Sequence, residues 1–163
     1  MLGKCEVCSG TGRIERPNDI QNLQSSQPEL SVENYEFSED QVRSRVEKGR
    51  AGNYVLGYSA LHSDTNIRVF HPTFVGRSDS DLREALLTRL AKKKAWHDQF
   101  KFSYAATVKE AFEKECQEFH LAASAKDLDN EKHPEPPAGT NFRCPIPDCS
   151  ALNHRYDTGE TST

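Results

Sequence analysis

Two pairs of cysteines near the ends of the chain are candidates for metal ligands. Cys5 and Cys8 are separated by two residues and are followed by glycines. Cys144 and Cys149 lie in a proline-rich tail. Zinc is held tetrahedrally by thiolates, which paired cysteines on short turns supply, and an odd total of five cysteines argues against a full set of disulfides. We therefore predict one structural zinc ion held by these four cysteines, with His154 as an alternative to Cys149.

The middle of the chain carries residues suited to phosphodiester hydrolysis. Residues 52–54 read Gly-Asn-Tyr, residues 74–77 read Phe-Val-Gly-Arg, and Glu115 follows a further helical pattern. Hydrolysis requires an activated nucleophile, positive charge on the phosphoryl oxygens and help for the leaving oxygen. A bound metal ion together with an arginine supplies the last two, and a carboxylate is the ligand that Mg²⁺ prefers.

The order of these parts over about residues 50–130 resembles the catalytic domain of the GIY-YIG nucleases. The resemblance implies that Tyr54 lies beside the metal and the attacking water, where it acts as the general base or assists it. It implies that Glu115, one turn after a small residue on its helix, holds Mg²⁺ or Mn²⁺. It also implies that Asn130 helps to order the site.

The chain departs from the pattern of this family at two positions. Phe74 keeps the ring of the second motif tyrosine but lacks its hydroxyl, and Ala85 stands where the family has a helix arginine. Arg89 lies one turn further along the same helical face, so it is the best geometric substitute. Arg83 and Arg77 are alternatives, and the planar guanidinium of Arg77 suits a phosphate.

A cationic segment follows the helix that carries these arginines. Lys92, Lys93 and Lys94 would line the route of a phosphate backbone, although basic residues also stabilise the end of a helix through its dipole. His71, three residues before Phe74, is a further candidate contact. The predicted partner is nucleic acid, DNA rather than RNA. A homodimer is compatible with this prediction, because a nuclease with one site often needs two copies to cut both strands.

The hydrophobic pattern predicts an α+β fold with a small three-stranded antiparallel or mixed sheet flanked by helices. Capping-box patterns open the first and third helices, and alternation of apolar and polar residues marks the strands. Pro72 suits a bulge or an edge within the second strand. The expected elements are a helix over 39–48, strands over 54–61 and 67–75, a helix from 82, a strand over 99–104 and a helix from 108.

Composition predicts one domain with additional segments. The chain has 163 residues of which 35% are hydrophobic, enough for one modest core. It shows no apolar run of about 18 residues and no secretory signal, so we expect a soluble, cytoplasmic protein without a membrane partner. The net charge of −4 does not exclude nucleic acid, because binding follows the local field. We divide the chain into a cysteine-pair segment (1–16), a linker (17–38), the nuclease-like domain (39–130) and a tail (131–163) that packs with the first segment.

Two alternatives to an endonuclease stay open at this point. The departures at Phe74 and Ala85 fit a catalytically inactive module that binds nucleic acid on the same scaffold. The cysteine pairs alone fit a zinc-held module for protein interaction, in which the resemblance at Tyr54 is a coincidence.

Overall fold

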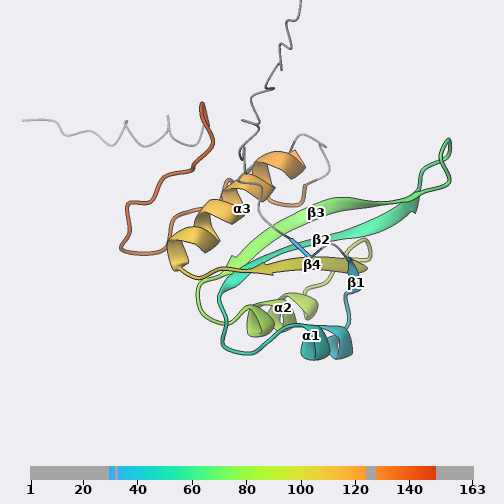
Figure 1. Cartoon of the computed structure of the whole chain (residues 1–163), viewed down its shortest axis with the longest axis horizontal. Helices are drawn as coiled ribbons and strands as arrows, with labels where there is room; N and C mark the ends of the chain where they lie inside the picture. The colour runs from blue at the N-terminus through green and yellow to red at the C-terminus, as the bar shows by residue number, and fades with distance from the viewer. Residues whose placement is uncertain (1–29, 32, 124–127, 150–163) are drawn as a thin grey trace, which may run out of the picture.

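A single antiparallel sheet organises the protein in the computed structural model, which describes residues 30–31, 33–123 and 128–149. The sheet has four strands in the order β1-β4-β2-β3, so β2 lies in the centre beside β3 and β4 (Figure 1). The strands are β1 (Tyr35–Glu36), β2 (Gly52–Leu61), β3 (Arg68–Ser78) and β4 (Gln99–Tyr104). The α+β class and the antiparallel arrangement of the three long strands agree with the prediction from sequence.

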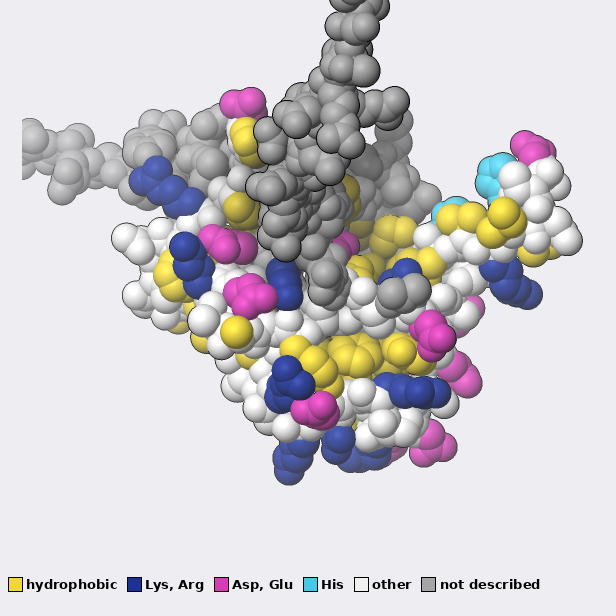
Figure 2. Space-filling model, viewed as in Figure 1, with side chains coloured by type: hydrophobic (Ala, Val, Ile, Leu, Met, Phe, Trp, Pro, Cys, Tyr) yellow, Lys and Arg dark blue, Asp and Glu magenta, His cyan; other side chains and the backbone are white. Residues whose placement is uncertain are grey.

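The strands β2 and β3 form a long hairpin with one irregularity. The register shifts between Leu56 and Gly57, and Gly57 pairs with Pro72. Proline has no amide hydrogen for the ladder, so a bulge beside it is the expected solution. The outer end of the hairpin projects from the domain (Figure 1) and carries apolar side chains on its surface (Figure 2), including the exposed Leu61 and Ile67.

Three helices cover the sheet: α1 (Glu39–Arg45), α2 (Leu82–Leu90) and α3 (Val108–Ala123). Asp81 is the N-cap residue of helix α2, and its side chain accepts a hydrogen bond from the Glu84 amide. Thr107 directly precedes helix α3, and its hydroxyl accepts a hydrogen bond from the Glu110 amide, as the capping box predicts. Helix α1 ends three residues before the predicted limit, and its N-cap Ser38 makes no side-chain cap bond.

The two faces of the sheet bury different sets of side chains. Helices α1 and α2 cover one face and α3 covers the other (Figure 1). Because side chains alternate along a strand, Tyr54 and Leu56 of β2 enter the core beneath α1 and α2, whereas Val55 packs towards α3. The first core is completed by Phe37, Val42, Val46, Leu82, Leu86 and Phe100.

The fourth strand is a difference from the predicted sheet. Tyr35 and Glu36 pair with Phe100 and Gln99 of β4, and the neighbouring Phe37 is fully buried. These residues fall within the segment predicted as a linker, whose stretch 17–29 lies outside the described residues. A two-residue strand carries too little alternation to be recognised in a sequence.

The described part of the tail has no helix or strand and packs on α3. Phe142 contacts Phe112 with ring centroids 6.5 Å apart, and Cys144 and Cys149 are buried in the same cluster as Cys116. Within the described residues, no helix combines the length and the apolar character needed to cross a membrane.

Candidate functional site

Tyr54 occupies the centre of the sheet and is almost completely buried. Its side chain is 6% exposed, and it pairs across the ladder with Gly76 of β3. The Tyr54 ring lies directly over this glycine: a Cβ atom at position 76 would lie 2.5 Å from Cζ and 2.6 Å from the hydroxyl oxygen. A side chain at position 76 would therefore clash with the Tyr54 ring.

A pocket of about 420 Å³ opens between Tyr54 and helix α2. Its wall contains two cationic side chains, Arg89 and Lys92, and two carboxylates, Asp81 and Glu84. Ala85 also lines it, one turn before Arg89. The remaining lining residues are Ser78, Ser80 and Thr88.

Arg89 is held at this pocket in an unusual environment. Its guanidinium carbon lies 3.6 Å from the centroid of the Phe74 ring, a cation–π contact. Its Nε is buried and has no hydrogen-bond partner in the part of the chain that the structure describes. A phosphate or carboxylate oxygen is the kind of acceptor that such a group lacks.

The two other candidate arginines lie elsewhere. The Nε of Arg83 donates to the carbonyl of Val46, so this side chain links α2 to the end of α1. Arg77 extends to the α3 side of the sheet, where its guanidinium lies over the Phe112 ring.

Glu115 is a buried carboxylate that pairs with Arg77. Its side chain is 11% exposed, and its Oε2 accepts a hydrogen bond from Arg77 Nη1. The Nε of Arg77 donates to Asp79 Oδ1 at 2.8 Å, so one guanidinium joins two carboxylates. Burial raises the pKa of Glu115, and the charge of Arg77 acts in the opposite direction.

The charges on both sides of the sheet act on the Tyr54 hydroxyl. Burial raises the pKa of Tyr54 to about 12, with Arg89 lowering it and Glu115 raising it further. Tyr54 is therefore a neutral phenol at neutral pH. These contributions relate Tyr54, Arg89 and Glu115 electrostatically, although the residues are widely spaced in the sequence.

Asn130 fixes the segment after α3 to the free edge of β3. Its amide nitrogen donates to the Val75 carbonyl and its amide oxygen accepts from the Val75 N–H, both at 2.8 Å. The preceding residue, Asp129, donates its backbone N–H to the carbonyl of Thr73. An asparagine side chain thus imitates the backbone of an additional strand.

Asp129 also binds three residues of the segment that follows α2. Its carboxylate accepts hydrogen bonds from Lys94 and Trp96 and lies 2.7 Å from Nε2 of the fully buried His97. Burial lowers the pKa of His97, although Asp129 opposes this effect. His97 joins Phe74 and Trp96 through ring contacts.

The predicted nucleic-acid contacts are dispersed. Lys92 lines the pocket, but Lys93 donates to the Phe37 carbonyl and Lys94 pairs with Asp129. His71 stacks on Tyr58 with centroids 5.0 Å apart, on the hairpin beyond the bulge. Figure 2 shows basic and acidic side chains interspersed on the visible face, without one continuous basic patch.

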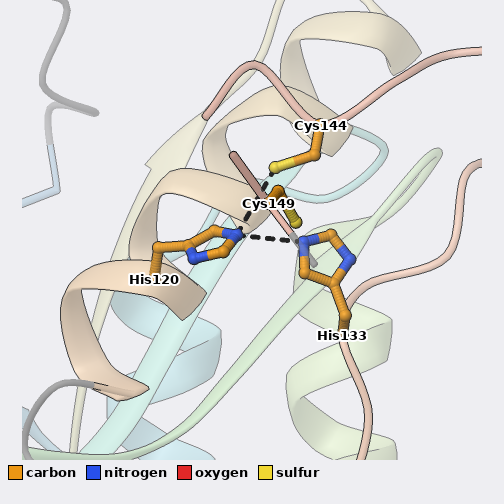
Figure 3. Close-up of side chains that lie close together, drawn as sticks. All are labelled: His120, His133, Cys144 and Cys149. Atoms are coloured by element: carbon orange, nitrogen blue, oxygen red, sulfur yellow. Dashed lines mark hydrogen bonds between the residues drawn. The ribbon is translucent and has the colours of Figure 1, made fainter. Parts of the chain in front are cut away.

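A second group of reactive side chains lies at the end of α3. The ligand atoms of His120, His133, Cys144 and Cys149 all lie within 4.8 Å of one another, and the four side chains point towards a common centre (Figure 3). This set of two histidines and two cysteines could bind a metal such as zinc. Cys144 and Cys149 were predicted as ligands from sequence, and Cys5, Cys8 and His154 lie outside the described residues.

The ligand set predicted from sequence did not include the two histidines of this group. His120 is on a helix and His133 in a loop, with no short spacing between them that resembles a metal-binding motif. Their proximity arises because the chain reverses after α3 and returns along it.

No family model, curated protein or solved structure matches this chain.

Proposed function

We propose that this protein is a metal-dependent endonuclease of the GIY-YIG type that hydrolyses phosphodiester bonds in DNA. The observation that carries the proposal is the pocket between Tyr54 and helix α2, whose wall holds Arg89 and Lys92. Glu115 lies on α3 at the other face of the sheet, and it shifts the pKa of Tyr54 in the direction opposite to Arg89. A tyrosine, an arginine and a buried carboxylate are the groups that the sequence resemblance implies.

The pocket beside Tyr54 supports a phosphate as the bound group. Arg89 Nε is buried without an acceptor, and Lys92 adds a second positive charge to the same wall. The hydroxyl groups of Ser78 and Thr88 line the pocket as well. These cations and hydroxyl groups suit the oxygens of a phosphodiester, which accept hydrogen bonds and carry negative charge, whereas Asp81 and Glu84 on the same wall oppose an anion.

The carboxylate of Glu115 suits a hard divalent cation such as Mg²⁺ or Mn²⁺. Burial raises the pKa of Glu115. A cation bound to this carboxylate would lower the pKa again, because the two opposite charges stabilise each other. Arg77 neutralises the same carboxylate, so a metal has to share or displace this ion pair. Glu115 does not line the pocket beside Tyr54, so a bound metal would bring positive charge and an acidified water to the site from the α3 side of the sheet.

The protein groups have separate roles in this proposal. Arg89 binds the phosphate and stabilises the charge that develops on its oxygens. Tyr54, with its pKa of about 12, orients the attacking water through a hydrogen bond and becomes a base only where a nearby cation lowers that pKa. This cation is distinct from any metal bound by the His120–Cys149 cluster, whose nitrogen and sulfur donors suit zinc.

A plasmid-cleavage experiment tests this function with matched variants. Wild-type protein with Mg²⁺ should convert supercoiled DNA to nicked and linear forms. Glu115→Ala and Tyr54→Phe should each reduce the rate by at least about 100-fold, because each removes a group that acts in the transition state.

Two neighbouring positions provide controls for these variants. Glu113 is on the same helix but pairs with the exposed Lys109, and Tyr58 is on the same strand but stacks on His71. Glu113→Ala and Tyr58→Phe should therefore cleave at the wild-type rate. Equal activity in Glu115→Ala and Glu113→Ala would refute the proposed site. If the wild-type protein cleaves neither DNA nor RNA with Mg²⁺ or Mn²⁺, the proposed nuclease activity is refuted.

One observation favours a second candidate function, a binding module without catalysis. Arg77 already neutralises Glu115, and Tyr54 is neutral at neutral pH. A site in this state can bind a phosphate at Arg89 without activating water. Affinity for DNA that falls as salt concentration rises, unchanged by Glu115→Ala, would identify this module.

A further inference from the structure

We propose that His120, His133, Cys144 and Cys149 form a structural zinc site that fastens the tail to helix α3. The four side chains come from three separate segments: the last turn of α3, the loop after it, and the turn over residues 144–149. They converge on one centre in Figure 3. The proposal goes beyond the nuclease function and does not depend on it.

Two of the distances between ligand atoms are close to those around a tetrahedral zinc ion. Zinc bonds of about 2.0 to 2.3 Å at tetrahedral angles place neighbouring ligand atoms roughly 3.3 to 3.8 Å apart. The two histidine Nε2 atoms lie 3.2 Å apart, and Cys144 Sγ lies 3.5 Å from His120 Nε2. The whole set lies within 4.8 Å, so the more distant ligand atoms would move inward by up to about 1 Å to enclose an ion.

Hydrogen bonds around the cluster prepare its ligands. The Nδ1 of His133 lies 2.8 Å from the Pro134 carbonyl, which can only accept, so the proton is on Nδ1. The Nε2 of His133 is therefore left with its lone pair directed into the cluster. The amide of Ile146 hydrogen-bonds to the Cys144 sulfur, the usual support for a zinc-bound thiolate.

This ligand set replaces the four-cysteine site predicted from sequence. Two imidazoles and two thiolates fill the four positions of a closed structural zinc site. No position is left for Cys5 or Cys8. Cys116, one turn before His120, hydrogen-bonds to Cys144 and belongs to the surroundings of the site.

A metal at this position would explain how the tail is held without secondary structure. The described tail contributes only Phe142, Ile146 and the two cysteines to a small apolar cluster on α3. A bound zinc ion would stabilise the position of the tail far more than this small apolar cluster does. Phe142 packs on Phe112, whose ring supports Arg77, so the site also steadies the helix that carries Glu115.

Metal analysis of purified variants tests the ligand set. Freshly prepared wild-type protein should contain about one zinc per chain, and Cys144→Ser and His133→Ala should bind zinc more than about 100-fold more weakly. The double variant Cys5→Ser/Cys8→Ser and the variant Cys116→Ala should keep the full zinc content. Loss of zinc from the double variant, or its retention in His133→Ala, would overturn the proposal.

Cobalt substitution tests the same point without any variant. Co²⁺ in the wild-type site should give the visible spectrum of a tetrahedral ion, with thiolate charge-transfer absorption of the intensity expected for two sulfurs. The intensity expected for four sulfurs would overturn the histidine ligands, and the spectrum of an octahedral ion would overturn the site itself.

Proteolysis tests the proposed fastening of the tail. Lys132 and Arg143 are exposed tail residues at which trypsin can cut. Removal of zinc by a chelator should accelerate cleavage at both by at least about tenfold, because the tail then opens far more often. Re-addition of zinc should restore protection, and equal cleavage rates with and without zinc would overturn the structural role.

Discussion

The three arginines near the proposed site differ in what their guanidinium groups contact. Arg89 lies in the pocket over the Phe74 ring, Arg83 binds the carbonyl of Val46, and Arg77 pairs with Glu115. Only Arg89 combines access to the pocket with a buried Nε that lacks an acceptor among the described residues. The loss of an arginine at position 85 is therefore compensated, in this proposal, by a cation one helical turn later.

This difference between the arginines leads to a prediction at the residue scale. Arg89→Ala should slow DNA cleavage by about 100-fold to 1000-fold and reduce the salt dependence of DNA binding by about one phosphate contact. Arg83→Ala should leave both properties unchanged and cost roughly 1 kcal/mol of stability, because it loses one hydrogen bond to α1. The cleavage rate, the salt dependence of DNA binding and the stability in urea are measured for both variants. Equal salt dependence in the two variants would show that Arg89 does not contact a phosphate.

At the scale of elements, the edge strand β3 is completed by a loop. The Asn130 amide pairs with both backbone groups of Val75. An unpaired edge would expose these groups to water or to another chain, and the loop covers them. The same contact holds the end of α3 beside the strand that carries Arg77.

Removal of the Asn130 amide should therefore weaken this edge. Asn130→Ala should lower the free energy of unfolding by about 1 to 3 kcal/mol, because two partly buried backbone groups lose their partners. Asn141→Ala, at an exposed position of the tail that follows, should change it by less than about 0.5 kcal/mol. Equal stability of the two variants in urea denaturation would show that the amide does not hold the edge.

At the scale of the whole molecule, the His97–Asp129 pair joins segments on either side of the long strands. His97 follows α2, Asp129 follows α3, and Lys94 and Arg89 are the cations that act on the histidine. Burial lowers the pKa of His97 below its ordinary value of 6.5, and the nearby cations contribute. The native protein therefore keeps His97 neutral over a range where the unfolded chain binds a proton.

The sign of this shift predicts how stability changes with pH. The unfolded state binds more protons below about pH 6.5, so the free energy of unfolding should fall as the pH is lowered from about 7.5 towards 5. Asp129, whose pKa is lowered by its hydrogen bonds despite burial, should lose its contribution only below its ordinary value of 3.8.

The variant His97→Gln isolates the contribution of this histidine. It should show a smaller loss of stability than wild type over the same pH range, because glutamine does not titrate. Urea denaturation at each pH, with zinc held in excess, measures the difference. Parallel pH profiles for the two proteins would exclude His97 as the source.

The sequence predicted the long elements because each has a strong local signal. Strand β4 was predicted with the bounds observed, since its aromatic and polar residues alternate over its full length. The capping-box pattern at Thr107 marked the beginning of α3, and the structure selects Asp81 as the residue that caps α2. Strand β1 was missed because two residues carry no period, and its place in the sheet depends on pairing with a distant strand.

Local sequence therefore determined the α+β class, the order of the long elements and the residue types that could carry chemistry. The tertiary structure decided which of these residues meet. It selected Arg89 for the pocket, paired Arg77 with Glu115, and brought His120 and His133 to the tail cysteines. The physical reason is that periodicity and capping act within a few residues, whereas a site is made of contacts between segments whose separation along the chain leaves no trace in local spacing.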